Sequence, residues 1–585
     1  MRLRYRPKGE DVGERFGSAF DDVFAARIAE SNAYYDALLP TNLKADERSL
    51  MRQAAGGLLW TKQFYHYVVE EWLTGDPAMP VPPPSRRRIR NADWGHLFNR
   101  DVISMPDKWE YPWYAAWDLA FHMLPMAKLD PDFAKRQLGI FLREWYMHPN
   151  GQIPAYEFEL SDVNPPVHAW AVLQVFLQER ECGREDYSFL AGAFQKLLMN
   201  FTWWVNRKDA FGEHLFSGGF LGLDNIGVFD RSKPLPTGGT LEQADGTAWM
   251  GFYCVIMLRI AFRLALVQRE YADTASKFFE HFIHIADAIN HLGGTGLWDE
   301  RDGFYYDRMR VGDQSTVLRV RSIAGLMPLC SAMILSQETV EKLPGFRRRM
   351  NWFLKYRQDL SRDMSYLETE EETDRPTDRL LALPSKERLR RALKYVFDEN
   401  EFLSPFGIRS LSKYHAANPY VFHVDGAEYR VGYEPAESQS GMFGGNSNWR
   451  GPIWFPLNYL LIESLRTYDA FYQEKFRIEY PTGSGEERCL REIADDLEDR
   501  LLSLFEPDAD GRIPYLGERP PAIDAAGEVM HEFFEYFDAE TGKGLGAAHQ
   551  TGWTALVINL LEARSKRRAE PREAQRVATV AHDIA

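Results

Sequence analysis

Two acidic residues stand in segments that are otherwise apolar and rich in glycine or aromatic residues. Asp224 lies in SGGFLGLDNIGVFD, residues 217–230, which contains four glycines and little competing charge. Glu535 lies in HEFFEYFDAETGKG, residues 531–544, among phenylalanines and a tyrosine. An apolar setting raises the pKa of a carboxyl group, so that the group can hold a proton near neutral pH. Two carboxylates delivered to one aromatic pocket are the minimal set for cleaving a glycosidic bond.

The alternative for any single acid is a helix cap or a surface ion pair. A cap needs no shell of glycine and aromatic residues, so this alternative is weaker for Asp224 than for most of the 85 acidic residues. From the residues alone, a glycosidase and a different pocket function both remain open.

Other catalytic chemistries lack their signatures. The run His531-Glu532-Phe533-Phe534-Glu535 has Glu where the HExxH zinc motif needs a second histidine. The chain contains no GxxxxGK[ST], no GxGxxG after a strand and no GxSxG, which disfavours nucleotide-dependent and serine hydrolase chemistry. The four cysteines show no CxxC spacing. We therefore expect neither a metal nor a cofactor.

Composition limits the class of partner. The chain has 585 residues, 45% of them hydrophobic and 26% charged, as in a folded protein. A net charge of -16 argues against nucleic-acid binding, which needs dense basic patches. The N-terminus has no apolar signal region, and no apolar run approaches the roughly 20 residues of a membrane span. We expect a cytoplasmic protein without a membrane partner, and the oligomeric state stays open.

Helical periodicity dominates the sequence. Helices are predicted near 18–38, 47–74, 113–128, 131–147, 166–181, 187–206, 245–270, 272–290, 321–336, 338–355, 386–397, 453–474, 486–504 and 550–565. Many are adjacent pairs, and a hairpin is predicted around Asp302-Gly303. The segments between them are long and rich in Trp, Tyr, Pro and Gly, and several carry a carboxylate. This alternation predicts an all-α toroid with the loops at one mouth, because a helical-repeat solenoid would need a fixed repeat length.

Five motifs then resemble a known family when taken in order. They are Trp117-Asp118-Leu119-Ala120-Phe121-His122, Gly222-Leu223-Asp224-Asn225, Asn448-Trp449-Arg450-Gly451-Pro452-Ile453-Trp454, Phe534-Glu535-Tyr536 and Thr551-Gly552-Trp553-Thr554. The set resembles glycoside hydrolase family 63, which contains processing α-glucosidase I, bacterial α-glucosidases and mannosylglycerate or glucosylglycerate hydrolases. The resemblance covers roughly residues 93 to 562.

The resemblance implies an (α/α)6 barrel that inverts anomeric configuration. By position, Asp224 matches the general acid, Glu535 the general base and Asp118 the acid that holds hydroxyls of the sugar in the −1 site. The expected substrate-binding residues are Trp117, Asp118, Tyr156, Asn225, Trp449, Arg450, Gly451 and Trp454. An inverting enzyme must leave room for water, so the two catalytic carboxyl groups should stand roughly 6.5–9.5 Å apart.

Two of these assignments have alternatives. Arg450 could pair with a loop acid such as Glu434 or Glu437, although a bidentate guanidinium also suits vicinal hydroxyls. Many relatives have Arg after the Ile-Pro pair, where this chain has Ala155-Tyr156. Packing is therefore an alternative role for Tyr156 and Glu157.

The resemblance also suggests the domain organisation. Residues 1–20 are interpreted as an N-terminal stub, the end of the β-rich domain that precedes the barrel in larger members. Residues 21–565 form the catalytic barrel with a surface excursion near 363–392, and 566–585 form a charged tail.

The expected function is an exo-acting α-glycosidase, in the first place an α-glucosidase of short glucosides. Mannosylglycerate, glucosylglycerate or trehalase-like hydrolysis on the same barrel is the alternative within enzymes. A non-catalytic glycan-binding toroid is the alternative of another class.

Overall fold

The structure is a computed structural model of the whole chain. It describes residues 2–9, 14–88, 94–106, 113–156, 163–209, 211–291, 296–357, 367–368, 377–442, 447–525, 527–548 and 552–570.

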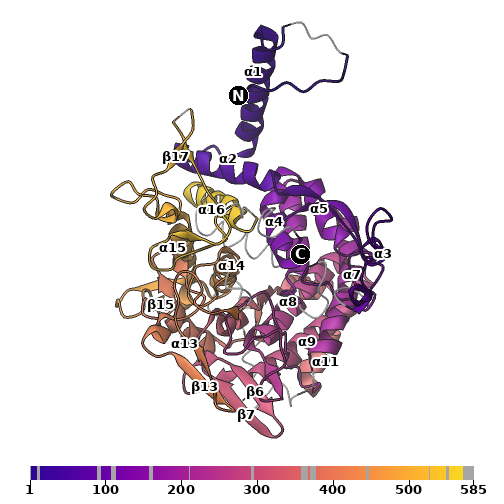
Figure 1. The fold of residues 1–585 in the computed structure, drawn as a ribbon. Coiled ribbons are helices and arrows are strands. Elements are labelled where there is room, and N and C mark those ends of the chain that lie inside the picture. Colours follow the sequence, from indigo (N-terminus) through magenta and orange to yellow (C-terminus); the bar gives the residue numbers. More distant parts are fainter. Residues whose placement is uncertain are drawn as a thin grey trace.

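Within the described residues, helical elements form an inner ring, of which Figure 1 labels α4, α8, α14 and α16. They are α4 (Ala116–Leu129), α6 (His168–Glu181), α8 (Ala244–Val267), η2 (Ile323–Cys330), α14 (Phe455–Tyr472) and the pair η7 (Thr554–Leu556) and α16 (Val557–Ala569). Each contacts the next in this order, and η7 and α16 contact α4, so the ring closes. The helix-rich class predicted from the sequence is confirmed, and no sheet among the described strands closes on itself.

A second set of helices surrounds this ring and alternates with it along the chain. The outer helices are α2 (Ala45–Leu59), α5 (Pro131–Ile140), α7 (Tyr187–Lys208), α9 (Tyr271–Asn290), α13 (Lys386–Val396) and α15 (Leu490–Ser503). Nearly every residue of α8 is buried, whereas the outer α9 buries one face, with Phe278, Phe279 and Phe282 directed inward. This is the expected pattern for an enclosed helix and for one that covers it.

The inner helices run in the same direction through the ring. Trp117 at the start of α4 contacts Trp553, just before η7, and Trp454, just before α14, also contacts Trp553. Lys128 at the end of α4 pairs with Glu562 near the middle of α16, and Lys566 in the last turn of α16 pairs with Glu181 at the end of α6. The ring therefore has an N-terminal mouth, where the inner helices begin, and a C-terminal mouth, where they end.

The helix predicted near 47–74 is wrong in its middle. The chain leaves α2 after Gly56-Gly57 and forms strand β1 (Lys62–Val68), which pairs with β2 (Phe98–Ser104), before α3 (Val69–Thr74). The segment KQFYHYV is rich in aromatic residues, and exposed and partly buried side chains alternate from Phe64 to Tyr67, as in a half-exposed strand.

Proline interrupts two other predicted helices. The segment near 321–336 forms the 3₁₀ helix η2, which contains Pro328, and then β8 (Ala332–Leu335). The segment near 338–355 divides into α10 (Gln337–Lys342) and α11 (Pro344–Tyr356), with Pro344 at the first position of the second helix. A missing amide hydrogen and a fixed φ make these the natural break points.

Short antiparallel hairpins fill the connections, and the hairpin predicted around Asp302-Gly303 is confirmed as β4 with β5. The strand bounds are β3 (Thr240–Glu242), β4 (Trp298–Asp299), β5 (Phe304–Tyr305), β6 (Asp307–Val311), β7 (Gln314–Leu318), β9 (Leu367–Glu368), β10 (Arg379–Ala382), β11 (Leu403–Ser404), β12 (Gly407–Ile408), β13 (Tyr420–Val424), β14 (Ala427–Val431), β15 (Arg477–Glu479), β16 (Glu487–Cys489), β17 (Ala522–Ile523), β18 (Val529–Met530), β19 (Tyr536–Phe537) and β20 (Gly544–Leu545). Short 3₁₀ turns are η1 (Pro84–Arg88), η3 (Lys413–Ala416), η5 (Gln473–Lys475) and η6 (Pro514–Leu516).

Strand β10 lies in the segment 363–392, which the sequence suggests is a surface excursion. It is the central strand between β8 and β9, and its residues Leu380, Leu381 and Ala382 are buried. The described part of this segment thus contributes to the core.

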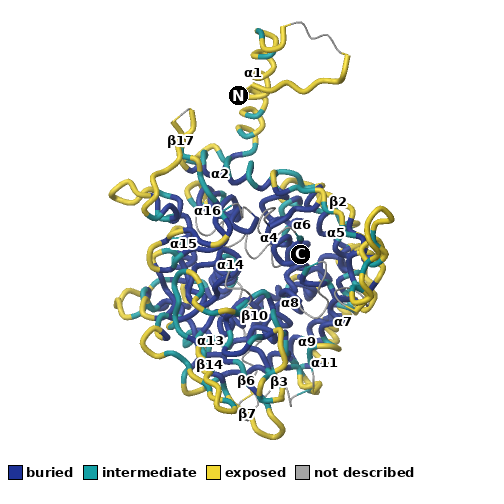
Figure 2. The backbone as a smooth tube through the Cα atoms, in the orientation of Figure 1, coloured by how far each residue is buried: buried dark blue, intermediate teal, exposed yellow. Residues whose placement is uncertain are grey.

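Two helices differ sharply in burial. Helix α1 (Ser18–Leu38) projects from the ring and contains no buried residue (Figures 1 and 2). Helix α8 is long and apolar enough to span a membrane, contrary to the sequence expectation, with a mean hydropathy of 1.9 over 18 residues. However, 89% of that window is buried inside the structure, so α8 is the core helix of the ring.

Candidate active site

The loop that carries Asp224 turns tightly against the start of α4. Leu221 and Gly222 have φ values of 53° and 68°, in the left-handed region. A Cβ atom at Gly222 would lie 2.8 Å from ring atoms of Trp117, so only glycine lets the backbone approach this indole. Asp224 follows two residues later, half-buried, beside the N-terminal mouth.

Asp118 lies next to Asp224 in the first turn of α4. Its side chain is buried. The pKa of the Asp118 carboxyl group is raised to about 8, mainly by burial. A hydrogen bond from a backbone N–H lowers this pKa in part, and the charge of Asp224 raises it. The Asp118 carboxyl group therefore keeps its proton at neutral pH, chiefly because it is buried, and the neighbouring charge of Asp224 adds to this effect.

Asn225 joins this loop to a segment more than 200 residues later in the chain. Its Oδ1 accepts a hydrogen bond of 2.7 Å from the backbone N–H of Trp449, across a separation of 224 residues. Its Nδ2 donates to Asn448 Oδ1 at 3.1 Å and to Ser438 Oγ at 3.1 Å. Asn225 is completely buried, so these bonds hold the loop without competition from water.

The Arg450 guanidinium reinforces the same junction. Its Nε donates to the carbonyl oxygen of Asn225 at 2.7 Å, and Nη2 donates to that of Gly227 at 3.2 Å. Its Nη1 lies 3.7 Å from Glu434 Oε1, so the pairing with a loop acid considered above is present. The side chain is almost fully buried. Arg450 thus positions the Asp224 loop.

At Gly451, the next residue, the backbone passes close to that of Glu434. Its φ is 152°, and a Cβ atom there would lie 2.8 Å from the carbonyl oxygen of Glu434. Its N–H donates to Ser410 Oγ at 3.0 Å. A side chain at this position would push the loop away from the segment that holds it.

Indole rings form a layer beneath the two acid-bearing segments. Trp449 and Trp454 stack with ring centroids 3.9 Å apart, and Trp449 lies 6.0 Å from Trp117. Trp454 stacks on Tyr536 at 4.6 Å, and Trp553 meets Trp117 edge-on at 5.5 Å. These indoles are almost completely buried, so the layer excludes water and forms a rigid apolar support for the two acid-bearing segments.

Glu535 is held at the edge of this layer, directly before strand β19. Trp553 Nε1 donates to the carbonyl oxygen of Glu535 at 3.0 Å. The N–H of Ala547 donates to Glu535 Oε2 at 3.3 Å, and only 5% of the residue is exposed. A backbone donor stabilises an ionised carboxylate, which is the form that a general base needs.

Two chains of contacts, joined to each other by the Trp117–Trp449 and Trp454–Trp553 ring pairs, connect the Asp224 loop with Glu535. One runs from Gly222 through Trp117 and Trp553 to the Glu535 backbone. The other runs from Asn225 through Trp449 and Trp454 to Tyr536. Segments some 300 residues apart in sequence meet at one mouth of the ring.

The predicted residue Tyr156 lies beside the segment that leads into α4. Its ring is 6.4 Å from that of Trp113, just before α4, and the preceding Ala155 carbonyl accepts from the N–H of Ala116. Glu157 lies outside the described residues.

Two residues of the site were absent from the predicted set although the quoted motifs contain them. Asn448 accepts from Asn225 and donates to the carbonyl oxygens of Glu434 and Ala436 at 2.7 and 2.6 Å. Trp553 anchors Glu535 as described. Their positions in the NWRGPIW and TGWT motifs were the sequence feature that could have identified them as residues of the site.

His122 is a structural residue of the same region. Its Nδ1 lies 3.0 Å from Ser104 Oγ, and burial lowers the pKa of its imidazole to about 3. A side chain at Gly552 would collide with this ring. Within the described residues, no group of three or more His, Cys, Asp or Glu side chains is arranged to hold a metal ion.

Comparison with known proteins gives a consistent picture. A family model for the mannosylglycerate hydrolase MGH1-like glycoside hydrolase domain matches residues 111–220 and 379–554. The second segment contains the Trp449–Trp454 loop and Glu535, whereas Asp224 lies between the two segments.

Curated relatives include proteins of two yeasts. The uncharacterized protein YMR196W of Saccharomyces cerevisiae is 51% identical over 557 residues, which are 92% of this chain and 51% of that protein. The chain thus spans about half the length of this relative. A probable mannosyl-oligosaccharide glucosidase of Schizosaccharomyces pombe is 31% identical over 175 residues, which are 30% of this chain and 15% of that protein.

Among solved structures, the GH63 mannosylglycerate hydrolase from Thermus thermophilus in complex with Tris aligns with 79% of this chain and 96% of its own, at a TM-score of 0.43 and 16% identity.

Proposed function

Because the chain belongs to glycoside hydrolase family 63, through its MGH1-like domain, we propose that it is an inverting, exo-acting α-glycosidase. Asp224 donates a proton to the glycosidic oxygen, and Glu535 removes a proton from the water that attacks the anomeric carbon from the opposite face. One C–O bond breaks and another forms, and the proton count balances between the two carboxyl groups.

The observation that carries this proposal is the double connection between the Asp224 loop and Glu535 through one indole layer. A glycosidase needs one carboxyl group that keeps its proton and one that stays ionised. Asp224 lies beside the buried Asp118, whose pKa is raised to about 8, and Glu535 receives a backbone N–H. Inversion predicts a separation of roughly 6.5–9.5 Å between the catalytic carboxyl groups in the substrate complex.

We also propose that the ring is an (α/α)6 barrel in which η2 takes one inner position. The alternation of outer and inner elements along the described chain supports this arrangement.

The preferred substrates are short α-glucosides. Mannosylglycerate is the second candidate, because the family model is named for a mannosylglycerate hydrolase. In both cases Asp118 binds hydroxyl groups of the sugar at the −1 site, and the indoles of Trp117 and Trp449 line it.

NMR-monitored hydrolysis of a panel of α-glucosides, α-mannosides, trehalose and glycosylglycerates tests the proposal. We expect release of the β-anomer as the first product. First release of the α-anomer would contradict inversion, and saturable sugar binding without product from any panel member would favour a non-catalytic toroid.

A further inference from the structure

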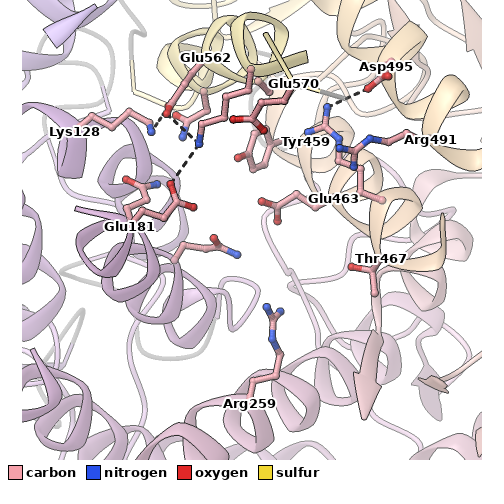
Figure 3. Close-up of a pocket in the computed structure, with 16 residues that line it drawn as sticks. Lys128, Glu181, Arg259, Tyr459, Glu463, Thr467, Arg491, Asp495, Glu562 and Glu570 are labelled. Atoms are coloured by element: carbon pink, nitrogen blue, oxygen red, sulfur yellow. Dashed lines mark hydrogen bonds and ion pairs between the residues drawn. The ribbon is translucent and has the colours of Figure 1, made fainter. Parts of the chain in front are cut away.

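The C-terminal mouth of the ring contains a cavity of about 250 Å³ that no part of the proposed reaction uses. Its walls come from the ends of α4 and α6, the middle of α8 and α14, and from α15 and α16 (Figure 3). At about 30 Å³ for each water molecule, it has room for about eight waters or one small organic molecule.

Packed aromatic side chains separate this cavity from the candidate active site. Trp117 contacts Phe121 at 5.9 Å, Phe121 contacts Trp170 at 5.2 Å, and Trp170 contacts Tyr459 at 6.3 Å. Tyr459 lines the cavity, and Phe121 and Trp170 are buried. The cavity is therefore a second location on the ring axis.

The charges around the cavity are balanced. Five basic and five acidic side chains line it: Lys128, Arg259, Arg466, Arg491 and Lys566, and Glu181, Glu463, Asp495, Glu562 and Glu570. Several neutralise each other, since Lys566 pairs with Glu181 at 3.3 Å and with Glu562 at 3.4 Å. A dianion such as phosphate would need an excess of basic groups, so this lining favours a ligand without net charge.

Uncommitted polar atoms also face this region. Asn559 is nine-tenths buried, and its Oδ1 has no hydrogen-bond partner among the described residues. Gln178 Oε1 is likewise without a partner there. Buried amide oxygens normally accept a hydrogen bond, so both call for a ligand with donor groups.

The remaining lining groups suit hydroxyl groups. Figure 3 shows Arg259 from α8 and Glu463 from α14 extending into the same opening from different sides, with Thr467 at its edge. Glu463 accepts from Trp170 Nε1 at 3.2 Å, and burial raises the pKa of its carboxyl group. Alternating donors and acceptors beside a tyrosine ring are the chemistry that binds vicinal hydroxyls.

We propose that this cavity is a second binding site for a small, uncharged polyhydroxylated molecule, either a monosaccharide or a short polyol. The ligand donates hydroxyl hydrogens to Asn559 Oδ1 and Glu463, accepts from Arg259, and exchanges a further hydrogen bond with the hydroxyl group of Thr467. The site does not depend on hydrolysis at the N-terminal mouth.

Titration calorimetry of the full chain carrying Glu535→Gln, with glucose and with glycerol as probes, tests the site and distinguishes a sugar from a polyol. We expect Asn559→Leu and Thr467→Val each to weaken binding of the favoured probe about tenfold, because each removes a hydrogen bond to it. Thr202→Val, on the exposed face of α7, is the matched control and should not change the affinity. If Asn559→Leu does not fold, the isosteric Thr467→Val decides alone.

Unchanged binding in the cavity variants, or displacement of the probe by equimolar inorganic phosphate, would overturn the proposal. The outcome is separable from the proposed function. If the wild-type chain hydrolyses no panel member while Thr467→Val weakens binding of the probe, only the proposed glycosidase function is refuted. Hydrolysis together with unaltered binding in both cavity variants would refute only the second site.

Discussion

The two mouths of the ring use charged residues in opposite ways. At the N-terminal mouth, Asp118 and Glu535 are buried among indoles, and Asp118 lies beside the like charge of Asp224. At the C-terminal mouth, acidic side chains such as Glu562 have lysine partners. Burial and a neighbouring like charge shift the pKa of a carboxyl group, which is typical of functional sites, whereas a pairing with lysine keeps the carboxyl group ionised and stabilises the fold. Glu463 at the C-terminal mouth is also buried with a raised pKa, so the contrast supports the proposed place of the chemistry through the adjacent acids Asp118 and Asp224.

The largest expected effect comes from the two proposed catalytic groups. Asp224→Asn and Glu535→Gln keep shape but cannot transfer the required proton, so each should lower kcat by about 10²–10⁴-fold or more. Initial rates on the best panel substrate measure this loss.

Two acids serve as controls for that experiment. Asp230→Asn alters the same loop, where Asp230 pairs with exposed Lys233, and Glu185→Gln alters an exposed acid beyond the end of α6. Both should stay within about twofold of the wild-type rate. Full activity in Asp224→Asn, or an equally large loss in either control, would contradict the assignment of the proton donor to Asp224.

The next effect concerns Arg450 and separates two roles for it. If its guanidinium positions the Asp224 loop, Arg450→Met should lower kcat by about 10²-fold and leave KM nearly unchanged. If it grips the sugar instead, KM should rise most. Steady-state kinetics discriminate between these outcomes, with exposed Arg430→Met as the matched control.

A smaller effect tests how closely the acid loop approaches the indole layer. Gly222→Ala forces a Cβ atom against Trp117 and should destabilise the fold by about 1–3 kcal/mol while reducing activity. Gly483→Ala, at a φ of 90° with open space around it, carries only the backbone strain and should leave activity intact. Urea denaturation and rates on both variants give the comparison. Equal losses of activity would show that contact with Trp117 is irrelevant.

The smallest effect is a pH dependence of stability. The folded-state pKa of Asp118 is raised to about 8 from 3.8, so the folded chain binds more protons than the unfolded chain between these values. Its burial therefore costs stability progressively as the pH rises from about 4 to about 8. Asp118→Asn removes this cost, and its Tm should gain a few degrees on wild type between pH 5 and pH 8.

Calorimetric scans at both pH values measure this gain. Asp132→Asn, exposed on α5, should show no such gain. A Tm difference between Asp118→Asn and wild type that does not change with pH would contradict the burial of an ionisable group at this position.

The sequence predicted the helices well because amphipathic periodicity is a local signal. The bounds of α1 were predicted without error, and those of α6 and α9 within two residues. The strand β1 and the breaks in the predicted helices at 321–336 and 338–355 were missed, because pairing with β2 and the effect of proline compete with periodicity.

The geometry of the candidate site could not be predicted locally. The motifs identified Asp224, Asn225, Trp449 and Glu535, but not that Asn225 and Trp449 bond to each other. Contacts across more than 200 residues depend on the closure of the ring, which no window of sequence contains. The commitment of the Arg450 donors to backbone carbonyls was likewise visible only in the structure.

The burial of the His122 imidazole simplifies the interpretation of pH–rate profiles for this protein. Its pKa near 3, and that of His168 near 4, keep both rings uncharged across the whole range in which rates are usually recorded. An ionisation limb close to pH 7 is routinely credited to histidine. In this protein such a limb would not come from either of these rings, and an inflection that disappears in Asp118→Asn would identify a carboxyl group as its source.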